Sequence, residues 1–382
     1  MRLQTFSGDL LIAAVLTVTC AATGCAQQSL NEWQRTDFTK SSVDLDEIMS
    51  GGPPKDGIPP IDKPLFVSFD EADSWLAAVE PVIGLDIDGE ARAYPLQILT
   101  WHEIVNDIIG DTPVSVTFCP LCNAAIAFDR RVEHDGKTLV LDFGTTGKLR
   151  KSDLVMYDRQ TESWWQQFTG EAIVGELTGT ELTLLAAPLI SYKQFKENYP
   201  GGKVLSRETG FQRSYGRNPY QGYDDISNNP FLFKDSVDPR LPAMERVINV
   251  SFDGQDTIYP LSVIQREGVI HDKVGNQDIV IFHLSGTASA LDKASIADSR
   301  DVGSTTVFRP EVDGTRLTFK RVGSGFVDDQ TGSRWNITGR AIAGPFKGKQ
   351  LEPVIHGNHF AFAWLAFNPN SIIYRQSERT KR

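Results

Sequence analysis

The chain has 382 residues, of which 40% are hydrophobic and 23% are charged, and its formal net charge is −11. This length exceeds that of most single domains, so we expect two domains in a soluble globular protein with a sizeable core. The acidic balance, with no block of Lys and Arg, argues against the basic surface that nucleic-acid binding requires.

The N-terminal residues 1–25 have the pattern of an export signal. Residues 10–22 are an uninterrupted run of apolar, Thr and Cys residues, close in length to a signal-peptide core and too short to span a bilayer comfortably. The sequence Ala-Thr-Gly-Cys at 22–25 resembles a bacterial lipoprotein box, which predicts lipidation of Cys25. We therefore expect a periplasmic or cell-surface protein that is anchored to the membrane surface through Cys25. Ordinary cleavage near the same point, which would release a soluble protein, is the alternative.

Residues 26–65 are predicted to form a tether followed by an extended segment. The sequence of 51–60, Gly-Gly-Pro-Pro-Lys-Asp-Gly-Ile-Pro-Pro, excludes a regular helix or central strand, because each proline fixes φ and lacks a backbone donor. The apolar residues Ile58, Ile61 and Leu65 suggest that this segment packs against the folded body.

The rest of the chain carries an internal repeat. The sequence VIGLDIDG at 82–89 recurs as VINVSFDG at 247–254, YDRQTESWW at 157–165 as VDDQTGSRW at 327–335, and GEAIVG at 170–175 as GRAIAG at 339–344. The shared order and near-constant spacing predict a tandem duplication, with unit one at residues 66–205 and unit two at residues 246–378. The connection between them, residues 206–245, has no regular pattern, so we expect it to lie on the surface or to be functional.

Each unit is predicted to be mainly β. Short alternating runs are separated by turn dipeptides such as Asp88-Gly89 and Asp253-Gly254, which is the pattern of hairpins. A short helix or an irregular corner is expected near residues 94–105, and a helix near residues 191–199. The predicted fold is therefore α+β in class, mainly β with a few short helices, and consists of two pseudo-equivalent β-rich units packed together.

The folded body contains a dithiol loop, Cys119-Pro-Leu-Cys122, and no cysteine beyond these two. In an oxidising compartment such a pair can form a disulfide or bind a metal. Unit two lacks both cysteines, and with Asp292 aligned to Asp129 it is two residues shorter at this point. The loop is therefore specific to unit one, which argues against a purely structural role.

Three functions are compatible with this loop. Two thiolates suit zinc or copper(I) and need one or two further ligands, usually His, so the loop is a candidate metal site in a metal carrier or an enzyme. A C-x-x-C pair can also serve as the centre of a metal-free dithiol–disulfide oxidoreductase. In the third interpretation, the cysteines form a structural disulfide in a non-enzymatic scaffold or partner-binding protein.

Three histidines are candidates to complete a metal site. His102 ranks first as a third ligand or as an acid–base partner, because it precedes the dithiol strand and its counterpart in unit two is Glu267. His356 and His359 form a weaker candidate pair, since two imidazoles close in sequence can chelate a metal. For each of them, a hydrogen-bonded structural role is the competing interpretation.

Three motifs in unit one point to a known family. They are WHEIVND at 101–107, TFCPLCN at 117–123 and MYDR at 156–159. Together they resemble a prokaryotic family of exported proteins, domain-of-unknown-function family 3179, and the resemblance runs from about Gly51 to near Tyr374. It implies that His102, Cys119 and Cys122 act as a unit, and it implies no substrate.

Overall fold

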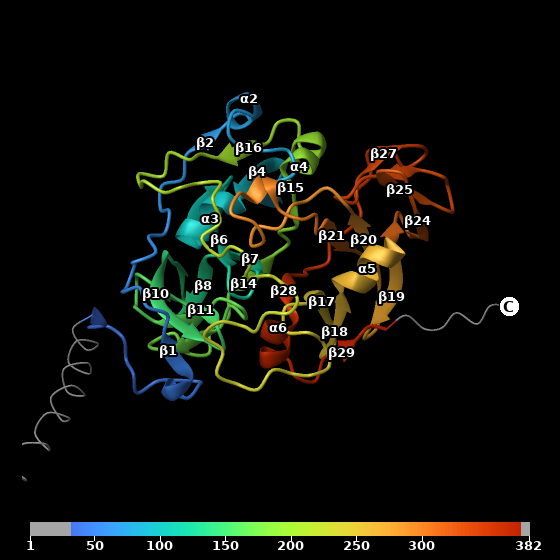
Figure 1. The fold of residues 1–382 in the computed structure, drawn as a ribbon. Helices are drawn as coiled ribbons and strands as arrows, with labels where there is room; N and C mark the ends of the chain where they lie inside the picture. Colours follow the sequence, from blue (N-terminus) through green and yellow to red (C-terminus); the bar gives the residue numbers. More distant parts are fainter. Residues whose placement is uncertain (1–31, 376–382) are drawn as a thin grey trace, which may run out of the picture.

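The computed structural model describes residues 32–375 (Figure 1). Strands predominate and the α-helices have four to seven residues, which confirms the predicted mainly β class. Within the described part of the chain, no helix is long and apolar enough to cross a membrane. The predicted export signal and the predicted lipidation site, Cys25, lie outside the described residues.

Unit one follows a short N-terminal region, and together they form three sheets and a separate hairpin. The N-terminal elements are η1 (Leu45–Glu47), β1 (Ile48–Ser50), β2 (Phe66–Val67) and α2 (Phe69–Ala72). The elements that follow are β3 (Pro81–Ile87), β4 (Glu90–Pro95), α3 (Leu96–His102), β5 (Ile104–Ile109), β6 (Thr112–Cys119), β7 (Ala124–Asp129), β8 (Arg131–His134), β9 (Lys137–Val140), β10 (Phe143–Arg150), β11 (Asp153–Asp158), β12 (Trp164–Gln166), β13 (Ala172–Val174), β14 (Thr183–Leu185), β15 (Leu189–Ser191), α4 (Tyr192–Asn198) and β16 (Lys203–Leu205). The strand orders are β15-β3-β4-β16-β2, β14-β7-β6-β5 and β1-β10-β11-β12-β13, with β8-β9 apart.

Unit two has elements that mostly follow the order of those in unit one, with one additional 3-10 helix and no counterpart of β14. They are β17 (Arg246–Phe252), β18 (Gln255–Pro260), α5 (Leu261–Glu267), β19 (Val269–Val274), β20 (Gln277–Leu284), η2 (Ile296–Asp298), β21 (Ser304–Phe308), β22 (Glu311–Val312), β23 (Thr315–Arg316), β24 (Phe319–Val322), β25 (Gly325–Asp328), β26 (Arg334–Trp335), β27 (Ala341–Ala343), β28 (Asn358–Phe360), α6 (Ala361–Phe367) and β29 (Ile372–Ile373). The strand orders are β28-β17-β18-β29, β19-β20-β21 and β24-β25-β26-β27, with β22-β23 apart. In both units the final strand pairs in parallel, β16 with β4 and β29 with β18.

Local chemistry explains why the two units share these elements. The β3–β4 turn has Asp88 and Gly89 at positive φ, and the β17–β18 turn has Asp253 and Gly254 in the same conformation, as tight hairpins require. This recurrence of turns and strand order is what a tandem duplication predicts, whereas the unit boundaries remain predictions.

The two units share a core of buried apolar side chains. The largest cluster of buried apolar side chains includes Phe118 and Phe128 of unit one together with Phe360 and Phe362 of unit two. The described N-terminal region also packs on unit one, because β1 pairs with β10 and Trp33 is buried. The dithiol loop therefore lies inside a body to which several distant segments contribute.

The structure corrects the alignment of the two units at the dithiol loop. In unit two, β20 ends at Leu284 and β21 begins at Ser304, so residues 285–303 replace the four-residue turn between β6 and β7. Unit two is therefore longer at this point, and the prediction that it is two residues shorter is wrong. Asp292, which the sequence aligned to Asp129, lies within this long connection. The conclusion that unit two lacks the dithiol is unchanged.

Each unit also repeats one buried aspartate. Asp158 accepts hydrogen bonds from the Thr161 amide (2.6 Å) and hydroxyl (2.9 Å) and from Trp165 Nε1 (2.9 Å). In unit two, Asp328 accepts the equivalent bonds from Thr331 (2.6 and 2.8 Å) and Trp335 (2.9 Å). Each carboxylate thus fixes a turn and satisfies a buried indole N–H.

We expect Asp158→Ala and Asp328→Ala each to lower the free energy of unfolding by about 3 kcal/mol, because each leaves buried donors unpaired. Urea unfolding of the two variants measures this loss. Asp329→Ala is the matched control, since Asp329 pairs with Lys320 on the exposed surface and its loss should cost less than about 0.5 kcal/mol. A change below about 1 kcal/mol in either buried variant would contradict the structural equivalence of the two turns.

Candidate metal centre

The dithiol loop is a tight turn between two buried strands. Strand β6 ends at Cys119 and β7 begins at Ala124, and the pair Cys119–Ala124 closes the ladder. The turn is completed by the Asn123 amide, which donates to the Pro120 carbonyl, and by the positive φ of Asn123. Cys119 and Cys122 are 2% and 0% exposed, and both are free thiols.

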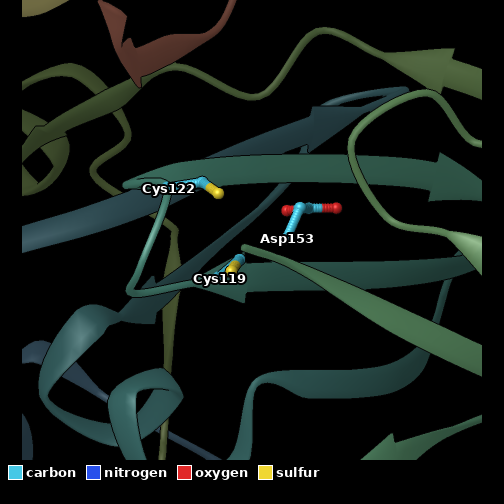
Figure 2. A group of neighbouring side chains, drawn as sticks. All are labelled: Cys119, Cys122 and Asp153. Atoms are coloured by element: carbon cyan, nitrogen blue, oxygen red, sulfur yellow. The ribbon is translucent and has the colours of Figure 1, made fainter. Parts of the chain in front are cut away.

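Asp153 is the third member of this group (Figure 2). It is the first residue of β11 and follows a turn in which Lys151 and Ser152 both have positive φ. One ligand atom from each of Cys119, Cys122 and Asp153 lies within 4.8 Å of the others. The sulfurs come from the end of β6 and from the turn that follows it, and the carboxylate comes from the start of β11, so these residues could hold a metal ion.

The Asp153 carboxylate is held in place by one of its oxygens only. Its Oδ2 accepts hydrogen bonds from the Phe168 amide (2.9 Å) and from Gln166 Nε2 (2.7 Å). Its Oδ1 is buried and has no hydrogen-bond partner among the described residues. A buried carboxylate oxygen without a partner is costly, and a bound cation would remove that cost.

Burial dominates the electrostatics of the group. It raises the pKa of Asp153 to about 7 and the pKa of Cys119 above its usual range, and it raises the pKa of Cys122 further still. Glu103, also buried, has its pKa raised to about 8 by burial and then by the charge of Asp153. These acidic groups therefore resist ionisation unless a positive charge enters among them.

The structure does not bring His102 into this group. Its Nδ1 lies 2.7 Å from the Pro59 carbonyl, which can only accept, so Nδ1 carries the proton. Its Nε2 then accepts from the Tyr215 hydroxyl at 2.6 Å. Burial lowers the pKa of His102, which favours this neutral form. Both ring nitrogens of His102 are thus hydrogen-bonded at the end of α3. The next residue, Glu103, is the one whose charge interacts with those of Asp153 and Cys119.

His356 and His359 also lie outside the group. Both line a cavity between the two units, and His359 packs against Phe168, with ring centroids 4.5 Å apart. The pair therefore faces a different space from the dithiol.

The connection of residues 206–245 and unit two cover the dithiol loop. The Tyr223 hydroxyl donates to the Leu121 carbonyl (3.1 Å), and the Phe360 amide donates to the Cys122 carbonyl (3.0 Å). Tyr220 lies close enough for the charges of Glu103 and Cys119 to raise its pKa, after the larger effect of burial. The 206–245 connection is thus part of the candidate site. Of the two expectations for it, this favours a functional segment over one that only lies on the surface.

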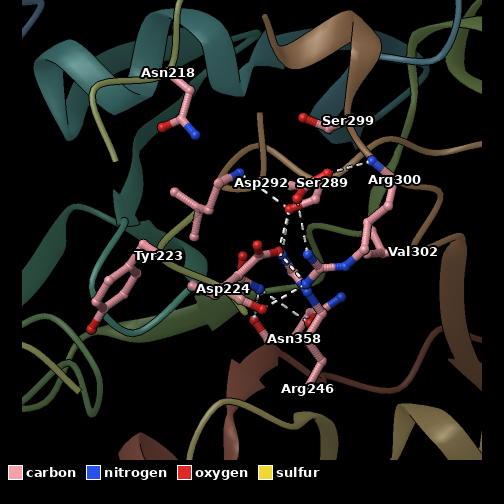
Figure 3. Close-up of polar contacts among 12 residues, drawn as sticks. Asn218, Tyr223, Asp224, Arg246, Ser289, Asp292, Ser299, Arg300, Val302 and Asn358 are labelled. Atoms are coloured by element: carbon pink, nitrogen blue, oxygen red, sulfur yellow. Dashed lines mark hydrogen bonds and ion pairs between the residues drawn. The ribbon is translucent and has the colours of Figure 1, made fainter. Parts of the chain in front are cut away.

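A buried ion-pair network fixes the connection beside Tyr223 (Figure 3). The Asp224 side chain is fully buried and lies 2.9 Å from Arg246 and 2.8 Å from Arg300. It also accepts a 2.5 Å hydrogen bond from the Ser289 hydroxyl. Ser289 and Arg300 belong to the long 285–303 connection of unit two, so the segment that distinguishes unit two helps to hold the cover over the dithiol.

Sequence reasoning missed Asp153 and Glu103. Asp153 directly precedes the apolar run Leu-Val-Met at 154–156, and an acid at the head of a buried strand was the available signal. Glu103 occupies a helix end with φ 59°, where unit two has Gly268 with φ 71°. A Glu in place of the expected Gly was therefore visible in the repeat.

A family model described as "Protein of unknown function (DUF3179)" matches residues 55–371, most of the chain. The chain belongs to the DUF3179 family. The match covers both units and the connection, and its description states no activity. A search of curated proteins found no match. A search of solved structures also found none.

We expect metal-free protein to lose stability as the pH rises from about 4 to 8, because folded Glu103 stays protonated while an unfolded Glu ionises near pH 4.3. Between these two pKa values the folded state binds more protons than the unfolded state. The resulting loss of unfolding free energy is therefore absent below pH 4 and complete above the pKa of folded Glu103. Glu103→Gln should therefore raise the unfolding free energy by about 5 kcal/mol at pH 8.5 and change it little at pH 4.

Urea unfolding at both pH values, in the presence of a chelator, measures this difference. The exposed Glu181→Gln is the control and should show no pH-dependent effect. Equal effects of Glu103→Gln at the two pH values would show that Glu103 is not held protonated by burial.

Proposed function

We propose that this DUF3179 protein is an exported, membrane-anchored metal-binding protein that holds one zinc ion with Cys119, Cys122 and Asp153. The proposal is supported above all by one observation: two thiols and a carboxylate converge in the core, and one carboxylate oxygen lacks a partner among the described residues. A divalent cation offsets the charge of three deprotonated ligands and satisfies that oxygen at the same time.

The ligand set favours zinc over copper(I). Zinc accepts sulfur and carboxylate ligands together, whereas copper(I) prefers soft thiolate and thioether ligands. Two cysteines alone are compatible with either zinc or copper(I). An Asp as the third ligand therefore favours zinc.

Burial of the group favours retention of the ion over turnover of a substrate. Cys122 and Asp153 have no exposed surface and Cys119 has only 2%. Catalytic zinc sites keep a coordination position open to substrate, and structural or storage sites are closed. Three protein ligands leave one of the four tetrahedral positions around the ion without a protein ligand. The 206–245 connection covers the loop on the side where the Tyr223 hydroxyl donates to the Leu121 carbonyl.

Export and anchoring rest on the sequence of residues 1–25. The apolar run at 10–22 and the box ending at Cys25 support a lipoprotein of the periplasm or cell surface.

A metal-free dithiol–disulfide oxidoreductase is the second candidate. A carboxylate with a pKa of about 7 beside a C-x-x-C pair could accept the proton of the attacking thiol during exchange with an external disulfide. The burial of both sulfurs weighs against it, because exchange requires contact between the attacking sulfur and the partner. Metal-free isolated protein whose thiols oxidise and reduce reversibly would favour this candidate.

We expect purified full-length protein to contain about one zinc per chain, and Cys119→Ser/Cys122→Ser to contain none, because thiolates supply most of the affinity. Asp153→Asn, which keeps the shape of the side chain and loses its charge, should bind zinc at least about tenfold more weakly. Plasma mass spectrometry and competition with a chromophoric zinc chelator measure stoichiometry and affinity.

His102→Gln is the matched control, because His102 is the ligand that the sequence favoured and the structure bonds it to Pro59 and Tyr215 instead. It should retain zinc at full stoichiometry. Loss of zinc in His102→Gln, together with unchanged zinc in Asp153→Asn, would overturn the proposed ligand set.

A further inference from the structure

The buried group around the dithiol keeps a small opening on one side. Cys122 and Asp153 have no exposed surface. Cys119 is 2% exposed and Glu103 is 7% exposed, so the remaining access to the group is on their side. Tyr220 borders the same side, because burial and then the charges of Glu103 and Cys119 raise the pKa of its hydroxyl. Solvent therefore approaches the dithiol beside Glu103 and Tyr220.

Glu103 is the unusual residue at this opening. Its carboxylate receives no hydrogen bond and no ion pair from the described residues, and neither of its oxygens is fully enclosed. Its φ of 59° is a strained conformation for a Glu, and unit two has Gly268 at the equivalent helix end. The fold therefore holds a strained carboxylate without a partner beside the dithiol. Such a group points to a ligand that supplies its hydrogen bond.

Glu103 lies near the proposed metal ligands but is not one of them. Burial, and then the charge of Asp153, raise the pKa of Glu103, so the two carboxylates are close enough to interact. The ligand atoms that lie within 4.8 Å of one another nevertheless belong, among the described residues, to Cys119, Cys122 and Asp153. A carboxylate just outside the ligand group can contact the ion through a bound water. Zinc takes four ligands in a tetrahedron, so three protein ligands leave a place for that water.

We propose that the fourth ligand of the zinc is a water molecule that donates a hydrogen bond to the Glu103 carboxylate and exchanges with solvent. This inference rests on the proposed zinc site. Glu103 is a positioning residue, because it acts on the ion through the water. Zinc, Glu103 and the Tyr220 hydroxyl give this water the polar partners that a buried water requires. The fourth position is thus accessible to water-sized molecules, whereas the 206–245 connection over the loop excludes larger ones.

The first test replaces zinc with cobalt(II) in the full-length protein, because cobalt(II) accepts the same ligands and is visible to optical and EPR spectroscopy. We expect the EPR lines to broaden in water enriched in ¹⁷O, since a coordinated water oxygen then carries a nuclear spin. Unbroadened lines would overturn the bound water and leave the three protein ligands in place. Absence of thiolate-to-cobalt charge-transfer absorption would instead overturn the zinc site itself, and this inference with it.

The second test concerns Glu103 and uses competition with a chromophoric zinc chelator. Glu103→Gly should retain about one zinc per chain and bind it about tenfold more weakly, because it removes the acceptor for the water and suits the positive φ. Glu103→Gln keeps an acceptor oxygen, so it should weaken binding by less than about threefold.

Glu80→Gln is the matched control, because Glu80 is a buried Glu whose carboxylate already has protein donors. It is 4% exposed and accepts hydrogen bonds from the Ala77 amide (3.0 Å) and from Gln97 Nε2 (2.7 Å). This variant should leave the zinc affinity unchanged. Undiminished zinc affinity in Glu103→Gly, or an equal loss in Glu103→Gly and Glu80→Gln, would overturn the role of Glu103.

Discussion

Four acidic side chains are buried together around the turn between β6 and β7, and the surrounding structure is organised to keep them there. Burial raises the pKa values of all four, and nearby negative charge raises those of Cys119, Cys122 and Glu103 further. Burying such groups is unfavourable, so the fold must restrain them through many contacts or a ligand must compensate. Both are consistent with the molecule: distant segments close over the turn, and one carboxylate oxygen is left without a protein donor.

The repeat explains how unit two supports the candidate site in unit one. Unit two reproduces the hairpins, the short helix after the second strand and the buried Asp–Trp turn, so it has the same scaffold. Where unit one has a four-residue dithiol turn, unit two has residues 285–303, which bind Asp224 of the connection. Unit two therefore supports the site from outside, through this segment and through the Phe360 amide bonded to Cys122.

Much of the fold was predictable from the sequence, because turn dipeptides and the repeat are local signals. The mainly β class followed from them, and so did the choice of the dithiol loop as the candidate site. The alignment at the loop was wrong because Asp292 resembled Asp129 in type, and only strand pairing shows that β21 begins at Ser304. A sequence cannot reveal which side chains a turn aims inward.

The sequence predicted only part of the candidate site, because it contains local signals and does not show which side chains meet. Cys119 and Cys122 were identified by spacing, whereas His102 was favoured because imidazole is a common ligand. Its orientation depends on Pro59 and Tyr215, which are distant in sequence. Asp153 lies 31 residues after Cys122 and joins the group only through the pairing of β11 with its neighbours and through Phe168 and Gln166.

X-ray absorption at the zinc K-edge tests the central claim most directly, because it identifies the ligands of the bound ion without any substitution. Zinc held by Cys119, Cys122 and Asp153 should show two sulfur neighbours at about 2.3 Å and one or two oxygen neighbours at about 2.0–2.2 Å, without the multiple scattering of an imidazole ring. A spectrum with imidazole scattering, or with fewer than two sulfurs, would contradict the proposed centre.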